Sequence, residues 1–442
     1  MSLIRLIRKI VFLAIPLFAG VAELPAQLVA DPAILAEVNR IRAIDNHAHP
    51  LPFLPDGTKD IEMDIADSVP PLGPPVRLRA TNPEYLDAWR NLYGYRYNDF
   101  SAPHLKELLE AKRRIQREKG AAYPAWVLDK LGIETMLANR ISLGSGQTPP
   151  RFRWVWHANP LLFPLDNSAA KINPQRRSDY ETDERWLKGF LTESGLAELP
   201  PTLDEYVNAF VVPLLQKRKR EGAVAVKFYA AYMRSLDFAD VSADEARPVY
   251  AKYARGGIPD AAEYKSLQDY LFRRIALECG RIHMPVHIHV GVGSGAWFYN
   301  NGASPFLLES VINDPKLRGT TFVLIHGGLP IAGASKVLLS KPNVYADFSS
   351  QTFLTSTRQL SQVIRGWLEL RPEKVLFGSD AYPLTTTIGW EEVGWIATKS
   401  ARLALAVALT EMMKDGEITR ERALKEARMV LRDNAARLYG IK

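Results

Sequence analysis

The chain has 442 residues, of which 47% are hydrophobic and 24% charged, a balance that excludes intrinsic disorder and fibrous repeats and allows a large core. The formal charge of +7 is modest, and its densest basic cluster, residues 217–220, follows an apolar helical pattern typical of a solvated helix end. No nucleic-acid partner is therefore expected. The single cysteine, Cys279, excludes an intramolecular disulfide and a multi-thiolate zinc site, and its surroundings indicate a packed helix residue.

The first 26 residues have the layout of a secretory signal peptide. Basic residues precede the apolar run 10–18, and the small residues Gly20, Ala22 and Ala26 follow it. The run is shorter than the roughly 20 residues that span a bilayer, so a stable membrane anchor is the less favoured alternative. We expect cleavage after Ala22 or Ala26, with residues 27–442 forming a single domain in the periplasm or outside the cell.

Eight short runs after residue 40 have the composition of β-strands. They span residues 41–47, 133–138, 153–157, 223–229, 284–290, 321–326, 343–348 and 375–377. Helical periodicity follows most of them, in residues 266–279, 305–312, 332–339, 360–369 and 396–414. Alternation of strand and helix indicates a parallel sheet, and eight repeats predict a closed (β/α)8 TIM barrel of the α/β class.

The chain is longer than the roughly 250 residues of a minimal barrel, so it must carry insertions. They are predicted at residues 50–130, after the first strand, and at residues 158–222, after the third. Both follow the C-terminal ends of strands, where barrel loops build the active site. We therefore expect both insertions to cover the pocket and not to form separate domains.

Polar side chains recur at the C-terminal ends of these strands. The set consists of His47 and His49 on the first strand, Lys227 on the fourth, His287 and His289 on the fifth, His326 on the sixth and Asp380 just after the eighth. Residues two apart on a strand share a face, so His47 and His49 can converge on one ion. Imidazole and carboxylate ligands suit zinc, manganese or iron. His157 closes the least regular strand and is not included.

Lys227 and Asp380 each have a functional interpretation and a structural alternative. Lys227 interrupts an apolar run, where burial would lower its pKa and make the amine available as a base or to carbon dioxide. Its ammonium would otherwise snorkel out or pair with Asp380. Asp380 would share the ion with the paired histidines and take a proton from the water that the ion activates, or it would merely cap a helix.

The fifth and sixth predicted strands also carry candidate histidines. His326 would complete the coordination sphere or polarise a substrate carbonyl. His289 is preferred to His287 as a ligand, because it lies nearer the strand end and is followed by Gly291 and Gly293, which would let a ligand approach the backbone. His287 is expected behind the ligands or in the core.

These motifs, in their order along the chain, resemble those of the amidohydrolase superfamily. The similarity is to the amidohydrolase-related group that includes the domain fused to glutamine-synthetase-like proteins in nodulin and FluG relatives. It extends from about residue 41 to the C-terminus and is strongest at residues 45–49, 285–291, 324–328, 343–347, 377–380 and 434–438.

The resemblance implies a metal site and a substrate site. It places a divalent ion, with zinc the first choice, on His47, His49, His289 and Asp380, and His326 beside it or on a second ion. Two ions are implied if Lys227 is carboxylated and bridges them. Tyr232 and Arg234 would bind a substrate carboxylate, or would cap the barrel rim.

The leading hypothesis is an exported hydrolase that uses metal-bound hydroxide on a C–N or ester bond of a small substrate, with Asp380 as general base. A carboxylate on this substrate is part of the expectation. Lys227 and His326 are the other candidate catalytic residues. The first alternative is a metal-dependent non-oxidative decarboxylase, and isomerisation of a sugar acid is more remote. A non-catalytic metal- or ligand-binding protein is the alternative outside catalysis. A homo-oligomer is left open.

Overall fold

The computed structural model describes residues 28–55, 58, 60, 62, 73–295 and 297–442. The predicted signal peptide lies outside these residues, so export stays a prediction. Within the described residues, no helix is both long and apolar enough to cross a membrane.

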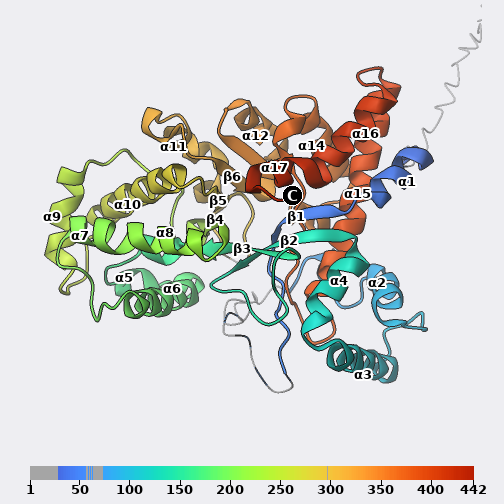
Figure 1. Cartoon of the computed structure of the whole chain (residues 1–442), viewed down its shortest axis with the longest axis horizontal. Coiled ribbons are helices and arrows are strands. Elements are labelled where there is room, and N and C mark those ends of the chain that lie inside the picture. The colour runs from blue at the N-terminus through green and yellow to red at the C-terminus, as the bar shows by residue number, and fades with distance from the viewer. Residues whose placement is uncertain (1–27, 56–57, 59, 61, 63–72, 296) are drawn as a thin grey trace, which may run out of the picture.

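Eight parallel strands form one sheet in which each strand pairs with the next along the chain (Figure 1). They are β1 (Ala43–Ala48), β2 (Ile133–Arg140), β3 (Phe152–His157), β4 (Ala223–Phe228), β5 (Val286–His289), β6 (Phe322–Ile325), β7 (Val344–Asp347) and β8 (Val375–Leu376). All eight predicted strands are present, and the predicted (β/α)8 barrel is confirmed.

Backbone hydrogen bonds between β1 and the segment that follows Leu376 close the barrel. The amide of Asn46 donates to Phe377 O at 2.8 Å, and the amide of Asp380 donates to His47 O at 2.7 Å. The eighth strand end is thereby held against the first, as a closed barrel requires. The carboxylate of Asp380 and the histidines of β1 come from backbones that are directly bonded.

The barrel interior is built in layers. One apolar cluster of the interior contains Ile44, Leu137, Val155, Ala225, Val323, Ile325 and Leu376, and the C-terminal residues Ala435, Ala436 and Ile441 join it. Side chains two residues further along a strand share its face, so Asn139, His157 and Lys227 form the next layer towards the C-terminal ends. The register pairs His157 with Lys227, and Lys227 with His287.

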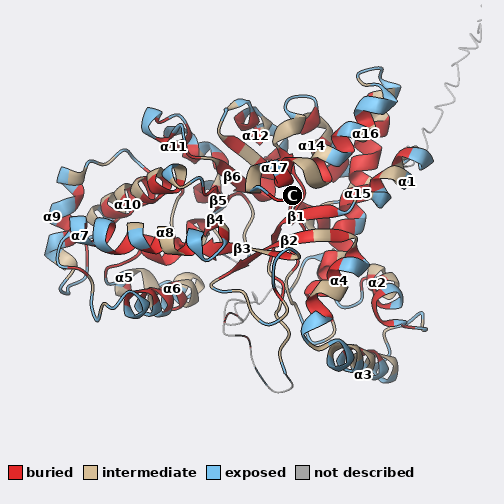
Figure 2. Cartoon of the chain, in the orientation of Figure 1, coloured by how far each residue is buried: buried red, intermediate tan, exposed pale blue. Residues whose placement is uncertain are grey.

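Helices surround the barrel, and Figure 2 shows buried residues along the strands and exposed ones at outer elements such as α9. Between the strands lie α5 (Ser168–Lys171), α6 (Pro174–Glu193), α7 (Leu203–Glu205), α8 (Val212–Arg220), α9 (Ala243–Tyr253), α10 (Ala261–Arg281), α11 (Glu309–Ile312), α12 (Ala332–Ser335), α13 (Gln351–Leu354) and α14 (Thr357–Leu368). After β8 come α15 (Trp390–Lys414), α16 (Arg420–Arg428) and α17 (Asn434–Tyr439). Cys279 is buried on α10, as predicted, and residues 217–220 end α8.

The N-terminal part of the described chain adds α1 (Pro32–Arg40), and the first insertion adds α2 (Glu84–Tyr93), α3 (Ala102–Lys119) and α4 (Tyr123–Leu131). Trp89 of α2 packs in one apolar cluster with Ile396 and Ala397 of α15. A buried ion pair between Lys112 and Glu392, 2.7 Å long, also joins α3 to α15. The first insertion is therefore fastened to the side of the barrel.

Candidate active site

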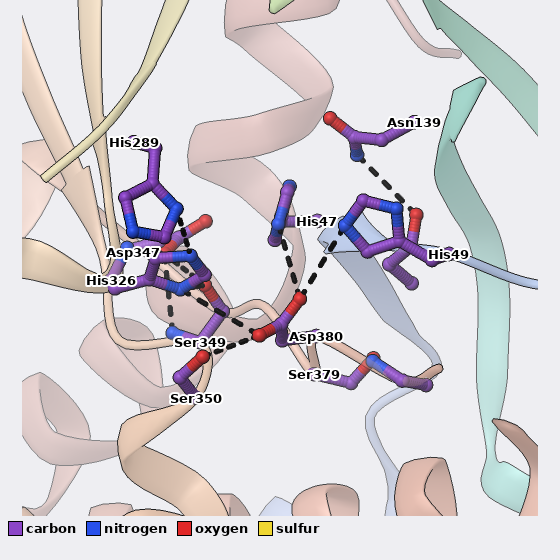
Figure 3. Close-up of polar contacts among 12 residues, drawn as sticks. His47, His49, Asn139, His289, His326, Asp347, Ser349, Ser350, Ser379 and Asp380 are labelled. Carbon is purple, nitrogen blue, oxygen red and sulfur yellow. Dashed lines mark hydrogen bonds and ion pairs between the residues drawn. The ribbon is translucent and has the colours of Figure 1, made fainter. Parts of the chain in front are cut away.

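Three of the predicted metal ligands converge at the C-terminal end of the barrel (Figure 3). His47 Nε2 lies 3.2 Å from Asp380 Oδ1, and His49 Nε2 lies 3.6 Å from the same oxygen. One ligand atom from each residue lies within 4.8 Å of the other two. The geometry suits a single ion held by two imidazoles and one carboxylate.

The backbone of the site is held in unfavourable conformations. Asp380, His326 and Ser350 have positive φ angles of 53°, 69° and 59°. Such angles are uncommon for residues other than glycine and cluster at functional sites, where the surrounding structure enforces them. These strained backbone angles therefore support the prediction that the functional site lies at this end of the barrel.

Contacts to both oxygens position the Asp380 carboxylate. The Ser350 hydroxyl donates a hydrogen bond to Oδ2, which leaves Oδ1 facing the imidazoles of β1. Burial raises the pKa of Asp380 to about 7, although the Ser350 hydrogen bond and the charge of Lys227 act to lower it. The alternative role as a helix cap is wrong, because the next helix begins only at Trp390.

Burial also keeps the histidines of the site neutral. It lowers the pKa of His47 well below the ordinary value and that of His49 to about 3, and the charge of Lys227 lowers both further. The neutral imidazole is the form that binds a metal ion. The electrostatics of the site therefore fit an ion and disfavour protonation.

A second pair of imidazoles faces the first across Asp380. His289 Nε2 lies 2.9 Å from Val292 O, which can only accept, so this nitrogen carries the proton. The Ser349 hydroxyl donates to Asp347 Oδ1 at 2.6 Å and so accepts from His326 Nδ1 at 2.9 Å. The remaining nitrogens, His289 Nδ1 and His326 Nε2, are 3.1 Å apart and both present lone pairs. Two facing lone pairs fit a cation.

The residues present therefore fit a divalent ion. Neutral imidazoles and a carboxylate form a borderline donor set that suits zinc. The lone pair on His326 Nε2 favours the predicted role as a ligand over polarisation of a carbonyl, which requires an N–H. His326 Nδ1 lies 4.0 Å from Asp380 Oδ2, so the second pair of histidines adjoins the first group.

Lys227 lies in the barrel interior with 3% of its surface exposed, so the snorkelling alternative is wrong. Burial lowers its pKa to about 8, while the charges of Asp380 and Asp347 act to raise it. An amine with this pKa is partly neutral at physiological pH. Carboxylation of Lys227 stays a prediction.

The two predicted substrate-binding residues point to different places. Tyr232 lines the cavity beside His289, with ring centroids 4.6 Å apart. Arg234 does not line it, because its guanidinium is bound to Asp269 at 2.5 Å and to Gln268 Oε1 at 3.0 Å. The placement of Arg234 contradicts its predicted contact with a substrate carboxylate.

The two glycines after β5 allow close packing of protein atoms. A Cβ on Gly291, whose φ is +78°, would lie 2.4 Å from Leu329 O, and a Cβ on Gly293 would lie 2.3 Å from the Phe298 ring. Protein atoms therefore occupy the position of a Cβ at both glycines, and Gly293 also lines the cavity, as the predicted approach of a ligand requires. Gly291 allows the loop after β5 to pass close to the turn that follows His326.

His287, the other histidine of β5, lies deeper in the barrel than His289, as expected. His287 Nε2 lies 2.8 Å from Tyr439 Oη, and the Tyr439 hydroxyl also bonds to Asn46 Oδ1. The side chain is buried and does not line the cavity. His287 links the barrel floor to α17.

A cavity of about 550 Å³ opens beside these residues. Its lining is His49, Leu51, Asp60, Glu62, Gly73, Pro74, Pro75, Arg79, Asn139, Arg140, His157, Tyr232, His289, Val292, Gly293, Ser294, Gly295, His326, Ser350, Phe353, Leu354, Asp380, Tyr382, Pro383 and Leu384. The first insertion supplies part of the wall, as expected. No residue of 158–222, all of which are described, lines it, so the expected cover from the second insertion is wrong.

Sequence reasoning missed several residues of this lining. His157 and Asn139 lie at the ends of β3 and β2, and a polar residue at a strand end was the signal that found the others. Asp60 and Glu62 belong to the first insertion, where no periodicity marked them. Arg140 joins them to the barrel through a bidentate ion pair with Asp60, at 2.7 and 2.8 Å.

Comparisons with known proteins agree with this architecture. A family model described as Amidohydrolase matches residues 167–441. The protein FluG of Emericella nidulans is 26% identical over 229 residues, which are 49% of this chain but only 25% of that protein. This chain thus spans about a quarter of that relative's length.

Solved structures of other proteins share the fold. A protein from Lactobacillus casei described as a metal-dependent hydrolase matches with a TM-score of 0.63 at 18% identity, over 92% of this chain and 97% of that one. Uronate isomerase from Thermotoga maritima matches with a TM-score of 0.56 at 14% identity, over 93% and 98%. Glucuronate isomerase from Caulobacter crescentus gives the same TM-score and identity, over 94% and 96%.

Proposed function

Because the chain belongs to the amidohydrolase family, we propose that it is a metal-dependent hydrolase that cleaves a C–N or ester bond in a small molecule. The observation that carries the proposal is the convergence of His47, His49 and Asp380 at the edge of a 550 Å³ cavity. When bound, a divalent ion lowers the pKa of water and polarises a substrate carbonyl.

The protein side of the reaction rests on Asp380. The Asp380 carboxylate lies in the cavity wall, where it would accept a proton from the attacking water and return it to a leaving group. Ser350 holds Oδ2 and so fixes the direction in which Oδ1 points. Lys227, behind it in the barrel, favours the ionised form of this carboxylate through its charge.

His47, His49 and Asp380 would hold the first ion. The facing nitrogens of His289 and His326 would complete its coordination or hold a second ion. The apolar part of the lining, which includes Phe353 and Leu384, would exclude water from the scissile bond.

The test compares metal-depleted protein with protein reconstituted with zinc, on a library of amides, esters, lactones, aromatic carboxylates and uronates. We expect hydrolysis of an amide, ester or lactone only with zinc, and a loss of about 10²- to 10⁴-fold in Asp380→Asn. His47→Ala should lose both turnover and most of its zinc by elemental analysis. His104→Ala, a histidine of α3 outside the cavity, should keep both.

Several outcomes would overturn the proposal. Full activity in His47→Ala or Asp380→Asn would remove the assigned site. Carbon dioxide release from an aromatic acid would indicate a decarboxylase, and interconversion of uronates would indicate an isomerase. Absence of any turnover with zinc bound would favour a binding protein.

A further inference from the structure

His157 is a buried histidine in the cavity wall whose ring has no polar partner. It is 2% exposed, and neither Nδ1 nor Nε2 makes a hydrogen bond to any residue that the structure describes. Burial lowers its pKa well below the ordinary value, so the ring is neutral and offers one donor and one acceptor. Buried polar atoms are nearly always hydrogen-bonded in native proteins, so these two require an explanation.

The ring of His157 is held firmly in this position. Its centroid lies 5.5 Å from that of Trp186 and 5.6 Å from that of Tyr229. The Tyr229 hydroxyl is hydrogen-bonded to Asp183 and does not bond to the imidazole. The neighbouring rings therefore orient His157 without satisfying its nitrogens, and its centroid is 6.4 Å from that of His49.

Asn139 presents a second unsatisfied atom on the same wall. Its Nδ2 donates to Leu137 O at 3.3 Å and to Ala48 O at 3.4 Å, which fixes the orientation of the amide. Its Oδ1 is buried and has no partner within the described part of the chain. Figure 3 shows Asn139 beside His49, across the site from His289.

The unsatisfied hydrogen-bonding atoms of the wall indicate the group that it would bind. The cation nearest to these residues in sequence, Arg140, is occupied by both oxygens of Asp60 and by Pro50 O and Ser142 O. Glu62 adds a further carboxylate, 3.4 Å from the guanidinium. An N–H or O–H at this place would meet Asn139 Oδ1 and a ring nitrogen of His157. A carboxylate would be attracted by the charge of Lys227, which acts on His157, but would face the acceptor Asn139 Oδ1 and the carboxylates of Asp60 and Glu62 in the same cavity.

We propose that His157 and Asn139 form a specificity subsite for an uncharged hydrogen-bond donor of the substrate, a hydroxyl or an amide N–H, in the cavity next to His49. The inference rests on the proposed metal-dependent function, because the ion would anchor the other end of the substrate. It places an uncharged group where the sequence predicted a carboxylate bound by Tyr232 and Arg234.

The test uses zinc-loaded protein and three hydroxamic acids of equal chain length, whose far ends are a primary amide, a carboxylate or a methyl group. The hydroxamate chelates zinc, and the far end reports on the subsite. Calorimetric titration should show the amide compound binding about tenfold more tightly than the methyl compound, and the carboxylate compound most weakly. His157→Leu should abolish the preference for the amide, and His157→Gln, which keeps a donor and an acceptor, should restore part of it.

His104→Leu makes the same chemical change outside the cavity and should leave all three affinities unchanged. Equal affinities, tighter binding of the carboxylate compound, or an unchanged preference in His157→Leu would overturn the subsite while the proposed function stands. If His157→Leu does not fold, the ranking of the three compounds on the unaltered protein decides alone. Failure of all three to bind zinc-loaded protein would overturn the proposed function, and the subsite with it.

Discussion

His289 Nδ1 and His326 Nε2 face each other at 3.1 Å, and the hydrogen bonds of the opposite ring nitrogens leave a lone pair on each. Two lone pairs at this distance repel, and a cation that both can coordinate removes the repulsion. We therefore expect zinc to raise the melting temperature of the metal-depleted protein by scanning calorimetry. A smaller rise in His289→Phe, which lacks one lone pair, would tie the effect to this pair, and an undiminished rise would contradict it.

The pH range over which zinc is retained follows from the burial of the paired histidines. The pKa of His49 is lowered to about 3, so the ring stays neutral far below the ordinary value of about 6.5. Protons therefore compete with zinc for the imidazole nitrogen only at a lower pH than they would at a histidine with the ordinary pKa. We expect elemental analysis to find zinc retained after dialysis at about pH 5, and release between pH 6 and 7 would contradict the prediction.

The buried ion pair of Arg140 and Asp60 predicts a strong coupling in a double-mutant cycle. Arg140→Met leaves the 6%-exposed Asp60 without its partner, which should cost about 3–5 kcal/mol of unfolding free energy. Adding Asp60→Leu should recover part of this loss, because it removes one unpaired charge, whereas Glu62, 3.4 Å from the guanidinium in the unaltered protein, stays without its partner. Urea unfolding measures all variants.

The pair Arg255–Glu198 provides the control for this cycle. Its atoms lie 2.9 Å apart, but its side chains are 56% and 78% exposed. Arg255→Met should cost less than about 1 kcal/mol. A similar small loss in Arg140→Met, or no recovery in the double variant, would show that the buried pair is not coupled to folding.

The barrel was predictable from the sequence because its signals are local. Each strand is a short apolar run, and parallel strands place their C-terminal ends together, so the convergence of His47, His49 and Asp380 followed from chain order alone. His157 carried the same signal as these residues. It was left out because its strand was the least regular of the eight, although the structure shows a regular strand with Trp154 and Trp156 packed on its outer face and Val155 and His157 on its inner face.

Other features depend on tertiary contacts that no local pattern marks. Arg234 is bound by Asp269, 35 residues later on α10, and this partner removes it from the cavity. Asp60 and Glu62 reach Arg140 from an insertion without periodicity. The contact between Ser349 and His326, which sets the proton position on His326, becomes visible only when the ends of β6 and β7 are placed side by side.

Gly291 and Gly94 form a matched pair of glycines with positive φ. A Cβ on Gly291 would lie 2.4 Å from Leu329 O, whereas a Cβ on Gly94, with a φ of +71°, meets no atom within 4 Å. Gly94→Ala should cost about 1–2 kcal/mol for its backbone conformation. Gly291→Ala should cost about 1–3 kcal/mol more, because the turn after His326 must move. Equal losses on urea unfolding would contradict the close approach.

The raised pKa of Asp183 predicts that the free energy of unfolding falls as the pH rises. Burial raises its pKa to about 8, against hydrogen bonds from Tyr229 and Asn159 that lower it. Between the unfolded value near 4 and the folded value, the native state holds a proton that the unfolded chain has released, so stability falls as pH rises through this range. One such group changes the free energy of unfolding by at most about 1.4 kcal/mol per pH unit.

Asp183→Asn isolates this contribution, because an amide mimics the protonated carboxyl with one donor end and one acceptor end. We expect the variant to lose less unfolding free energy than the unaltered protein between pH 5 and pH 8, measured by urea unfolding. Asp244→Asn, whose side chain is 91% exposed, should keep the original pH dependence. Equal pH dependence in Asp183→Asn would show that Asp183 is ionised in the folded protein, and the ring of Tyr229, which orients His157, would then be held by a carboxylate.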